Sequence, residues 1–139
     1  EGQDLTIVAI GKMVERAVEV SNILERQGKD VEVINVRFLK PLDEENILKS
    51  IKKTKNVITI EDNILKGGLG SRIEELIIKS ELKDINFKKY GYPDEFVKHG
   101  SVVQIEEKYK LNTEDIAKDI LEHDNYYIKN SENCDATCC

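Results

Sequence analysis

Short apolar runs alternate with stretches of helical periodicity along the first part of the chain. Residues 5–10, LTIVAI, form a nearly continuous apolar run that ends at Gly11, which predicts a strand covered on both faces. From Met13 the apolar side chains recur at helical spacing until Gly28, which indicates a helix lying on the sheet. The predicted inward residues of this helix are Val14, Ala17, Val18, Ser21 and Leu24.

The same alternation continues through most of the chain. Residues 31–36, VEVINV, alternate apolar and polar side chains, which favours a strand at or near an edge of the sheet. A helix capped by Asp43 follows, with Ile47, Leu48 and Ile51 inward, and then a strand at 57–60. Next come a helix from Ser71, with Ile73, Leu76 and Ile77 inward, and a strand at 84–90 with a turn at 91–94. The last predicted elements are helices at 102–109 and 113–122, capped by Ser101 and Asn112.

This order of elements predicts an α/β fold, because parallel strands with short connections are joined by right-handed helical crossovers. With residues 5–10 in the centre, the expected architecture is a three-layer α/β/α fold around a mainly parallel sheet with strand order 2-1-3-4. The strand order then reverses between strands one and three, and such folds usually bind ligands at the carboxyl ends of those strands. We therefore expect residues 11–13 to face residues 61–63.

A glycine-rich stretch after the third strand carries the candidate site. The predicted strand turns at Glu61-Asp62-Asn63, crosses three glycines and enters a helix at Ser71, where Glu74 completes a capping-box pattern. The first N–H groups of such a helix can bind an anion or a neighbouring carbonyl group. The simpler interpretation, a tight turn with close helix packing, is favoured because neither common phosphate-binding motif is present. The candidate contact or anion loop comprises Glu61, Asp62, Asn63, Gly67, Gly68, Gly70, Ser71 and His99.

The other chemical candidates give no catalytic constellation. Glu61 and Asp62 are adjacent, so as strand residues they point to opposite faces and do not form an acid/base pair. His99 has no serine, cysteine or metal-ligand partner at motif spacing, and we interpret it as a residue that orders its loop. Positive φ is expected at Gly68 or Gly70. We predict that no residue of this chain is catalytic, binds a cofactor or binds a metal.

Composition narrows the class of protein. The 139 residues carry a net charge of −6 with the charges interspersed, which argues against nucleic acid or an anionic membrane as a partner. Cys134, Cys138 and Cys139 end a polar segment, 124–139, which is predicted to be a disordered tail with free thiols rather than a metal site. A core without cysteine predicts a reducing, cytoplasmic location. The start at Glu1, without Met, suggests a piece of a longer protein.

Three stretches resemble a known family: LTIVAIGKMVERAVEVSNIL from Leu5, VEVINVRFLKPLDEENI from Val31, and the residues 61–63 followed by 67–71. On these the chain resembles the C-terminal domain of the transketolase-like, thiamine-diphosphate-dependent enzymes. The stretch at 91–100, GYPDEFVKHG, resembles the 1-deoxy-D-xylulose-5-phosphate synthase branch in particular. The resemblance runs to His123, and it indicates one transketolase C-terminal-like domain over residues 1–123.

The resemblance implies a parent transferase that condenses pyruvate with glyceraldehyde 3-phosphate, giving 1-deoxy-D-xylulose 5-phosphate and CO₂ for isoprenoid, thiamine and pyridoxal synthesis. Its cofactors, thiamine diphosphate and Mg²⁺, would be held by two upstream domains. This chain would be a non-catalytic domain whose partners are those domains and a second copy in a homodimer. The family domain usually begins with an antiparallel strand ahead of Leu5, so the resemblance predicts that this sheet lacks that edge strand and exposes residues 31–36 to self-association.

Two alternatives stay open. The chain could be a free-standing doubly wound module that binds a nucleotide or a phosphate at the turn from Gly67 to Ser71. It could also be the same domain from a transketolase or from a pyruvate dehydrogenase beta subunit. A ligand screen separates the first alternative from an interaction domain, because a true ligand raises the stability of the chain that binds it.

Overall fold

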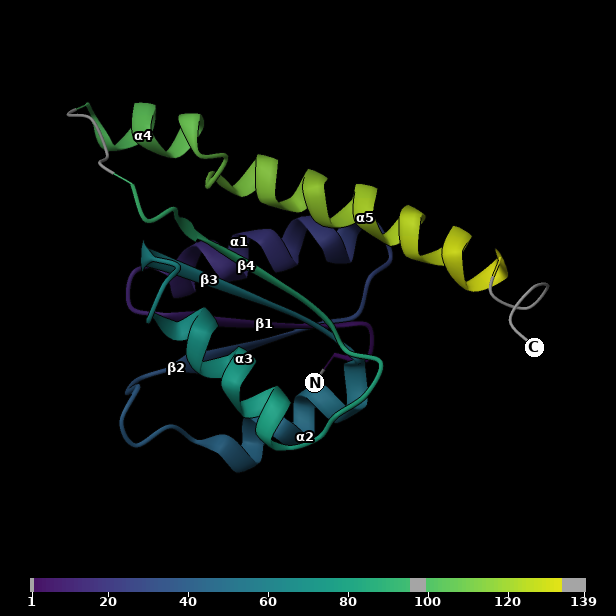
Figure 1. Ribbon diagram of the computed structural model, residues 1–139. Helices are drawn as coiled ribbons and strands as arrows, with labels where there is room; N and C mark the ends of the chain where they lie inside the picture. The colour runs from purple at the N-terminus through teal and green to yellow at the C-terminus, as the bar shows by residue number, and fades with distance from the viewer. Residues whose placement is uncertain (1, 96–99, 134–139) are drawn as a thin grey trace.

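The computed structural model describes residues 2–95 and 100–133, with side chains up to His123 (Figure 1). Predicted features at Phe96–His99, including candidate His99, and at Cys134–Cys139 lie outside the described residues. The elements in chain order are β1 (Leu5–Ile10), α1 (Met13–Arg26), β2 (Val31–Val36), α2 (Glu44–Thr54), β3 (Asn56–Ile64), α3 (Leu69–Lys79), β4 (Asn86–Tyr92), α4 (Val102–Lys108) and α5 (Thr113–Asn133).

The four strands form one parallel sheet with the order β2-β1-β3-β4. Helices α1 and α5 cover one face of this sheet, and α2 and α3 cover the other (Figure 1). The predicted three-layer α/β/α fold and its strand order are therefore confirmed. Residues ahead of β1 lie against the start of β2, where a Cβ added to Gly2 would stand 2.3 Å from the backbone nitrogen of Glu32.

The central strand explains why its sequence is apolar at almost every position. Ile7 and Ala9 face the cluster formed with α1 and α5, whereas Val8 faces the cluster formed with α2 and α3. Successive side chains of a strand point to opposite faces, so a strand covered on both sides needs an unbroken apolar run. All three residues are fully buried, as the sequence pattern predicts.

Polar side chains fix the starts of three helices as predicted. Asp43 caps α2 by accepting a hydrogen bond from the backbone N–H of Asn46 at 3.3 Å. Ser101 and Gln104 form a reciprocal capping box at the start of α4. Asn112 accepts from the backbone N–H of Asp115 at 2.8 Å ahead of α5. Each cap satisfies an N–H group that the helix itself leaves unpaired.

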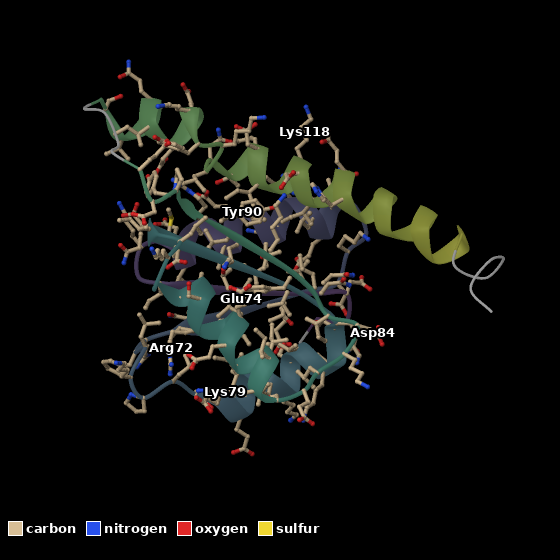
Figure 2. The ribbon with its side chains drawn as sticks, in the orientation of Figure 1. Arg72, Glu74, Lys79, Asp84, Tyr90 and Lys118 are labelled. Carbon is tan, nitrogen blue, oxygen red and sulfur yellow. The ribbon has the colours of Figure 1, made fainter. Side chains whose placement is uncertain are left out.

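Helix α5 is fastened to the edge strand β4 by a polar cluster. The hydroxyl of Tyr90 donates to Asp119 Oδ2 at 2.6 Å, and Lys88 forms an ion pair with the same carboxylate. Figure 2 shows Tyr90 between β4 and α5, on the other side of the sheet from Glu74 of α3. Burial, and then the Asp119 carboxylate, raise the pKa of Tyr90, so its hydroxyl stays a donor.

Three sequence predictions about these elements are corrected. Val18 of α1 is exposed and Val20 is buried instead, because α1 packs against α5 as well as the sheet. Strand β4 continues through the predicted turn to Tyr92, where it pairs with Ile64. Helix α5 continues to Asn133, past the predicted end at Glu122, since residues 123–133 contain no glycine or proline to stop it.

Candidate functional site

The site lies at the carboxyl ends of β1 and β3. Strand β3 does not turn at Glu61-Asp62-Asn63 as predicted but continues through these residues to Ile64. Between Ile60 and Ile64 its register with β4 shifts, because β4 advances only from Tyr90 to Tyr92 over the same length. Two extra residues on one strand make a bulge, which bends the strand and re-aims its side chains. The acidic residues therefore project from an irregular strand end and not from a loop.

Glu61 is a buried carboxylate that fills the start of α3. Its side chain is 1% exposed, and its two oxygens accept from the backbone N–H groups of Leu69 at 2.8 Å and Gly70 at 3.0 Å. Burial raises the pKa of Glu61, and the two N–H groups and Lys89 offset this only in part. The helix start that the sequence offered as an anion site is thus occupied by a carboxylate of the chain itself.

The glycines around Glu61 are required by close packing. A Cβ on Gly68 would lie 2.1 Å from Glu61 Oε2, and one on Gly70 would lie 2.9 Å from the hydroxyl of Thr59. The prediction of positive φ at Gly68 or Gly70 is wrong, because Gly68 has φ −90° and Gly70 is helical. Positive φ occurs at Gly67, with φ 76°. Lack of a side chain, not a special backbone angle, explains Gly68 and Gly70.

The predicted capping box at Ser71 does not form. Helix α3 begins at Leu69, two residues earlier than predicted, with Gly68 at the N-cap. The hydroxyl of Ser71 donates to the carbonyl of Leu65 at 2.8 Å and accepts from the N–H of Gly67 at 3.1 Å. Glu61 satisfies the helix start from outside the helix, which leaves Ser71 to close the preceding loop. Glu74, the expected partner of Ser71, pairs with Lys89 instead.

On the other side of β3, Asp62 reaches the loop after β1. Its Oδ2 lies 2.6 Å from Lys12 Nζ, so the predicted meeting of residues 11–13 with residues 61–63 occurs. The pKa of Lys12 is raised by its hydrogen bond and ion pair with Asp62. Burial, and then the Asp62 charge, raise the pKa of Tyr92. Asn63 accepts from the N–H of the following residue, and Glu61 and Asp62 have separate partners.

Sequence reasoning missed the polar contacts that hold α4 over this end of the sheet. Arg16 of α1 donates to Glu106 Oε2 at 2.9 Å and to the carbonyl of Leu111 at 2.8 Å. The rings of Tyr92 and Tyr109 meet edge to face, with centroids 5.7 Å apart. Arg16 follows Lys12 by one helical turn, so helical spacing alone could have placed both residues on the same side of α1.

The acidic side chains at this end of the sheet are bound to other groups of the chain. Within the described ranges no group of histidine, cysteine, aspartate and glutamate side chains could hold a metal ion. The carboxylates of Glu61, Asp62 and Glu106 are bound to backbone N–H groups, Lys12 and Arg16 respectively. No helix in the described part of the chain is long and apolar enough to cross a membrane.

Comparison with known proteins places the chain in a family. Residues 1–116 match the transketolase C-terminal domain, and the chain belongs to that family. It is 42% identical over 120 residues to the 1-deoxy-D-xylulose-5-phosphate synthase of Heliobacterium modesticaldum. This alignment covers 85% of this chain and 18% of that protein. The synthase of Desulforudis audaxviator is 39% identical over 118 residues, with 85% and 19% covered. The chain spans about a fifth of the length of the curated relatives it matches. The predicted resemblance to the C-terminal domain of the synthase is confirmed.

Solved structures agree with this assignment. A split-gene transketolase, an inactive beta4 tetramer, is 35% identical with a TM-score of 0.78 over 88% of this chain and 39% of that one. A transketolase mutant from Pichia stipitis is 18% identical with a TM-score of 0.58 over 89% of this chain and 17% of that one. At that identity the second structure supports the fold alone.

Proposed function

We propose that this chain serves as the non-catalytic C-terminal domain of a 1-deoxy-D-xylulose-5-phosphate synthase. The observation that carries this proposal is the carboxylate of Glu61 at the start of α3. A phosphate or diphosphate bound there would have to displace a carboxylate held by two N–H groups at 2.8 and 3.0 Å. The position where doubly wound folds usually bind ligands is therefore used for internal support.

In this proposal the chemistry belongs to the rest of the parent protein. That transferase would join pyruvate, after decarboxylation, to glyceraldehyde 3-phosphate in the cytoplasm. Thiamine diphosphate and Mg²⁺ would bind to its upstream domains, and the enzyme would act as a homodimer. The ion pairs and hydrogen bonds of Lys12, Asp62, Arg16 and Glu106 support a contact role for this domain, because they fix the loops at the carboxyl end of the sheet.

The competing phosphate-binding module predicts a ligand at the same helix start. A thermal-shift screen of the chain with nucleotides, sugar phosphates and thiamine diphosphate with Mg²⁺ tests it. We expect no shift, whereas a true ligand at a hundredfold excess over its Kd would add about 2.7 kcal/mol of stability. A reproducible shift that grows in Glu61→Gln, which removes the charge that competes for the N–H groups of Leu69 and Gly70, would favour the binding module.

One observation keeps a second candidate open. The split-gene transketolase matches at 35% identity, close to the 36–42% of the synthases. The chain could therefore be the equivalent domain of a transketolase with a divided gene. A domain exchange separates the two candidates, because the synthase and the transketolase form different products.

The exchange uses the Heliobacterium modesticaldum synthase, with its matched 120-residue segment replaced by the aligned part of this chain. We expect the hybrid to form 1-deoxy-D-xylulose 5-phosphate, while the isolated chain forms none. The controls are the parent synthase and the same protein with the segment deleted. A folded hybrid no more active than the deletion control would overturn the proposal.

A further inference from the structure

Helix α4 adds no residue to the two hydrophobic clusters formed by the described residues. Those clusters take their side chains from the four strands and from α1, α2, α3 and α5. None of the 7 residues of α4 is buried, and Val102 and Val103 are 60% and 63% exposed. A helix of this length is not stable in water by itself. The position of α4 therefore depends on a small number of contacts with the body of the domain.

The guanidinium group of Arg16 makes two of these contacts. One nitrogen donates to Glu106 Oε2 at 2.9 Å, and the other donates to the carbonyl of Leu111 at 2.8 Å, just past the end of α4. A planar guanidinium group can hold two acceptors in fixed directions, and an ion pair that is largely shielded from water is screened less than an exposed one. The side chains of Arg16 and Glu106 are 21% and 12% exposed. Arg16 itself is held firmly, because α1 buries Ala17 and Val20 against its neighbours.

Tyr109, the residue that follows α4, makes the other attachment. Its ring meets that of Tyr92 in β4 edge to face, with centroids 5.7 Å apart. Its hydroxyl donates to Glu95 Oε1 at 2.8 Å. Figure 1 shows α4 at the upper left, beyond the end of β3. Helix α4 is thus attached across the carboxyl end of the sheet through Arg16 and Tyr109.

The buried body of the domain resumes directly after α4. The N–H of Leu111 donates to the carbonyl of Glu106 at 2.8 Å, and that of Lys110 donates to Glu107 at 3.2 Å. With Lys110 at φ 54°, these bonds form the Schellman motif that commonly ends a helix. Leu111 is 2% exposed, and Ile116 of α5 is fully buried. Leu111 therefore marks a boundary between an exposed helix and a packed one.

We infer that α4 is a latch, which opens by local unfolding while the rest of the domain stays folded, and that Arg16 holds it closed. Segments with few buried apolar contacts open more readily than the core beside them, because opening them gives up little. Opening separates Tyr109 from Tyr92 and uncovers Arg16. The latch thereby controls access to the carboxyl end of the sheet.

Native-state hydrogen exchange of the chain tests whether α4 opens by itself. The probes are the amides of Ile105 and Tyr109, which donate to the carbonyls of Ser101 and Ile105, and the reference is the amide of Val20 in α1. Relative to intrinsic rates, we expect the α4 amides to exchange at least about a hundredfold faster than that of Val20. Low concentrations of urea should accelerate exchange at Val20 only, because a local opening exposes little surface. Equal rates with equal urea dependence would show that α4 unfolds only with the whole domain, and the latch would be overturned.

Substitutions test whether Arg16 holds the latch. Arg16→Leu removes both donors, so the amides of Ile105 and Tyr109 should exchange at least about tenfold faster than in the wild type and stay insensitive to low urea. Arg16→Lys should have a smaller effect, because one ammonium group cannot hold both acceptors as the fork does. The matched control is Arg72→Gln, which breaks the exposed pair of Arg72 with Glu75 in α3 and should change α4 exchange by no more than about twofold.

A second variant keeps the test decisive if Arg16→Leu does not fold. Glu106→Ala removes the acceptor from α4 and favours the helix intrinsically, so faster exchange can come only from the lost contact with Arg16. Faster α4 exchange in Glu106→Ala and in folded Arg16→Leu, but not in Arg72→Gln, supports the latch. Unchanged α4 exchange in these variants, or equal acceleration in the control, would overturn the role of Arg16.

Discussion

The two ends of the sheet each hold a glutamate, and the partners of the two carboxylates differ. At the amino end, Glu32 of β2 accepts from the hydroxyl of Ser50 at 2.6 Å and from Lys53 at 2.7 Å. At the carboxyl end, Glu61 of β3 accepts from two backbone N–H groups, those of Leu69 and Gly70. One carboxylate is neutralised by a side chain, and the other is held by a helix start.

This difference shows in the proton affinity of the two groups. Burial acts to raise the pKa of Glu32, but Lys53 and Ser50 together hold it below the ordinary value. Burial raises the pKa of Glu61 above that value, since its N–H donors offset the cost of burial only in part. The carboxyl end thus positions α3 with a buried carboxyl group whose ionisation is opposed by burial. At the amino end, by contrast, polar side chains bind one another, as Glu32 does with Ser50 and Lys53.

The largest effect should come from removing the internal carboxylate. Glu61→Ala leaves the N–H groups of Leu69 and Gly70 buried without an acceptor and opens a space beside Gly68. We expect a loss of about 2 to 4 kcal/mol in the free energy of unfolding, measured with urea. Glu61→Gln keeps one acceptor oxygen and the size of the side chain, so it should lose about half as much. Equal losses in the two variants would show that the carboxylate has no special role at the helix start.

Most of the fold follows from local patterns in the sequence. The apolar run at 5–10, the alternation at 31–36 and the caps Asp43, Ser101 and Asn112 all specify elements that the structure contains. These signals depend on neighbouring residues only, and they fix the order of strands and helices. Once that order is fixed, right-handed crossovers leave few ways to arrange a parallel sheet.

The site was only partly predictable, because its contacts join distant residues. Ser71 and Glu74 carry a local capping pattern, yet Glu61, eight residues before Leu69, takes the role of the cap. No sequence pattern near Glu61 predicts the bulge that directs the Glu61 side chain towards α3. The meeting of Lys12 with Asp62 was predictable from strand order, since Lys12 follows β1 and Asp62 lies near the carboxyl end of the neighbouring strand β3.

A pH series should separate the two ends with opposite signs. Glu32 has a lowered pKa, so its contribution to stability is present above the ordinary value of 4.5 and is lost as the pH falls through its folded pKa. Glu61 has a raised pKa, so its contribution is present below 4.5 and is lost as the pH rises through its folded pKa. The stability of the wild type minus that of Glu32→Gln should therefore decline on the acid side of 4.5. The corresponding difference for Glu61→Gln should decline above 4.5, and curves that bend on the same side would contradict the comparison.

The smallest effect concerns the exposed pair at the carboxyl end. Lys12 and Asp62 act on the pKa of Tyr92 with opposite signs, because the cation stabilises a phenolate and the carboxylate opposes it. Lys12→Gln should raise the pKa of Tyr92 further, whereas Asp62→Asn should lower it towards the ordinary value of 10.0. Neither change should measurably alter the melting temperature, since ion pairs at the surface contribute little. Carbon-labelled tyrosine followed by NMR gives the titration, and Tyr92→Phe assigns its signal among the five tyrosines. Shifts of the same sign in both variants would show that Tyr92 senses a rearranged loop rather than the two charges.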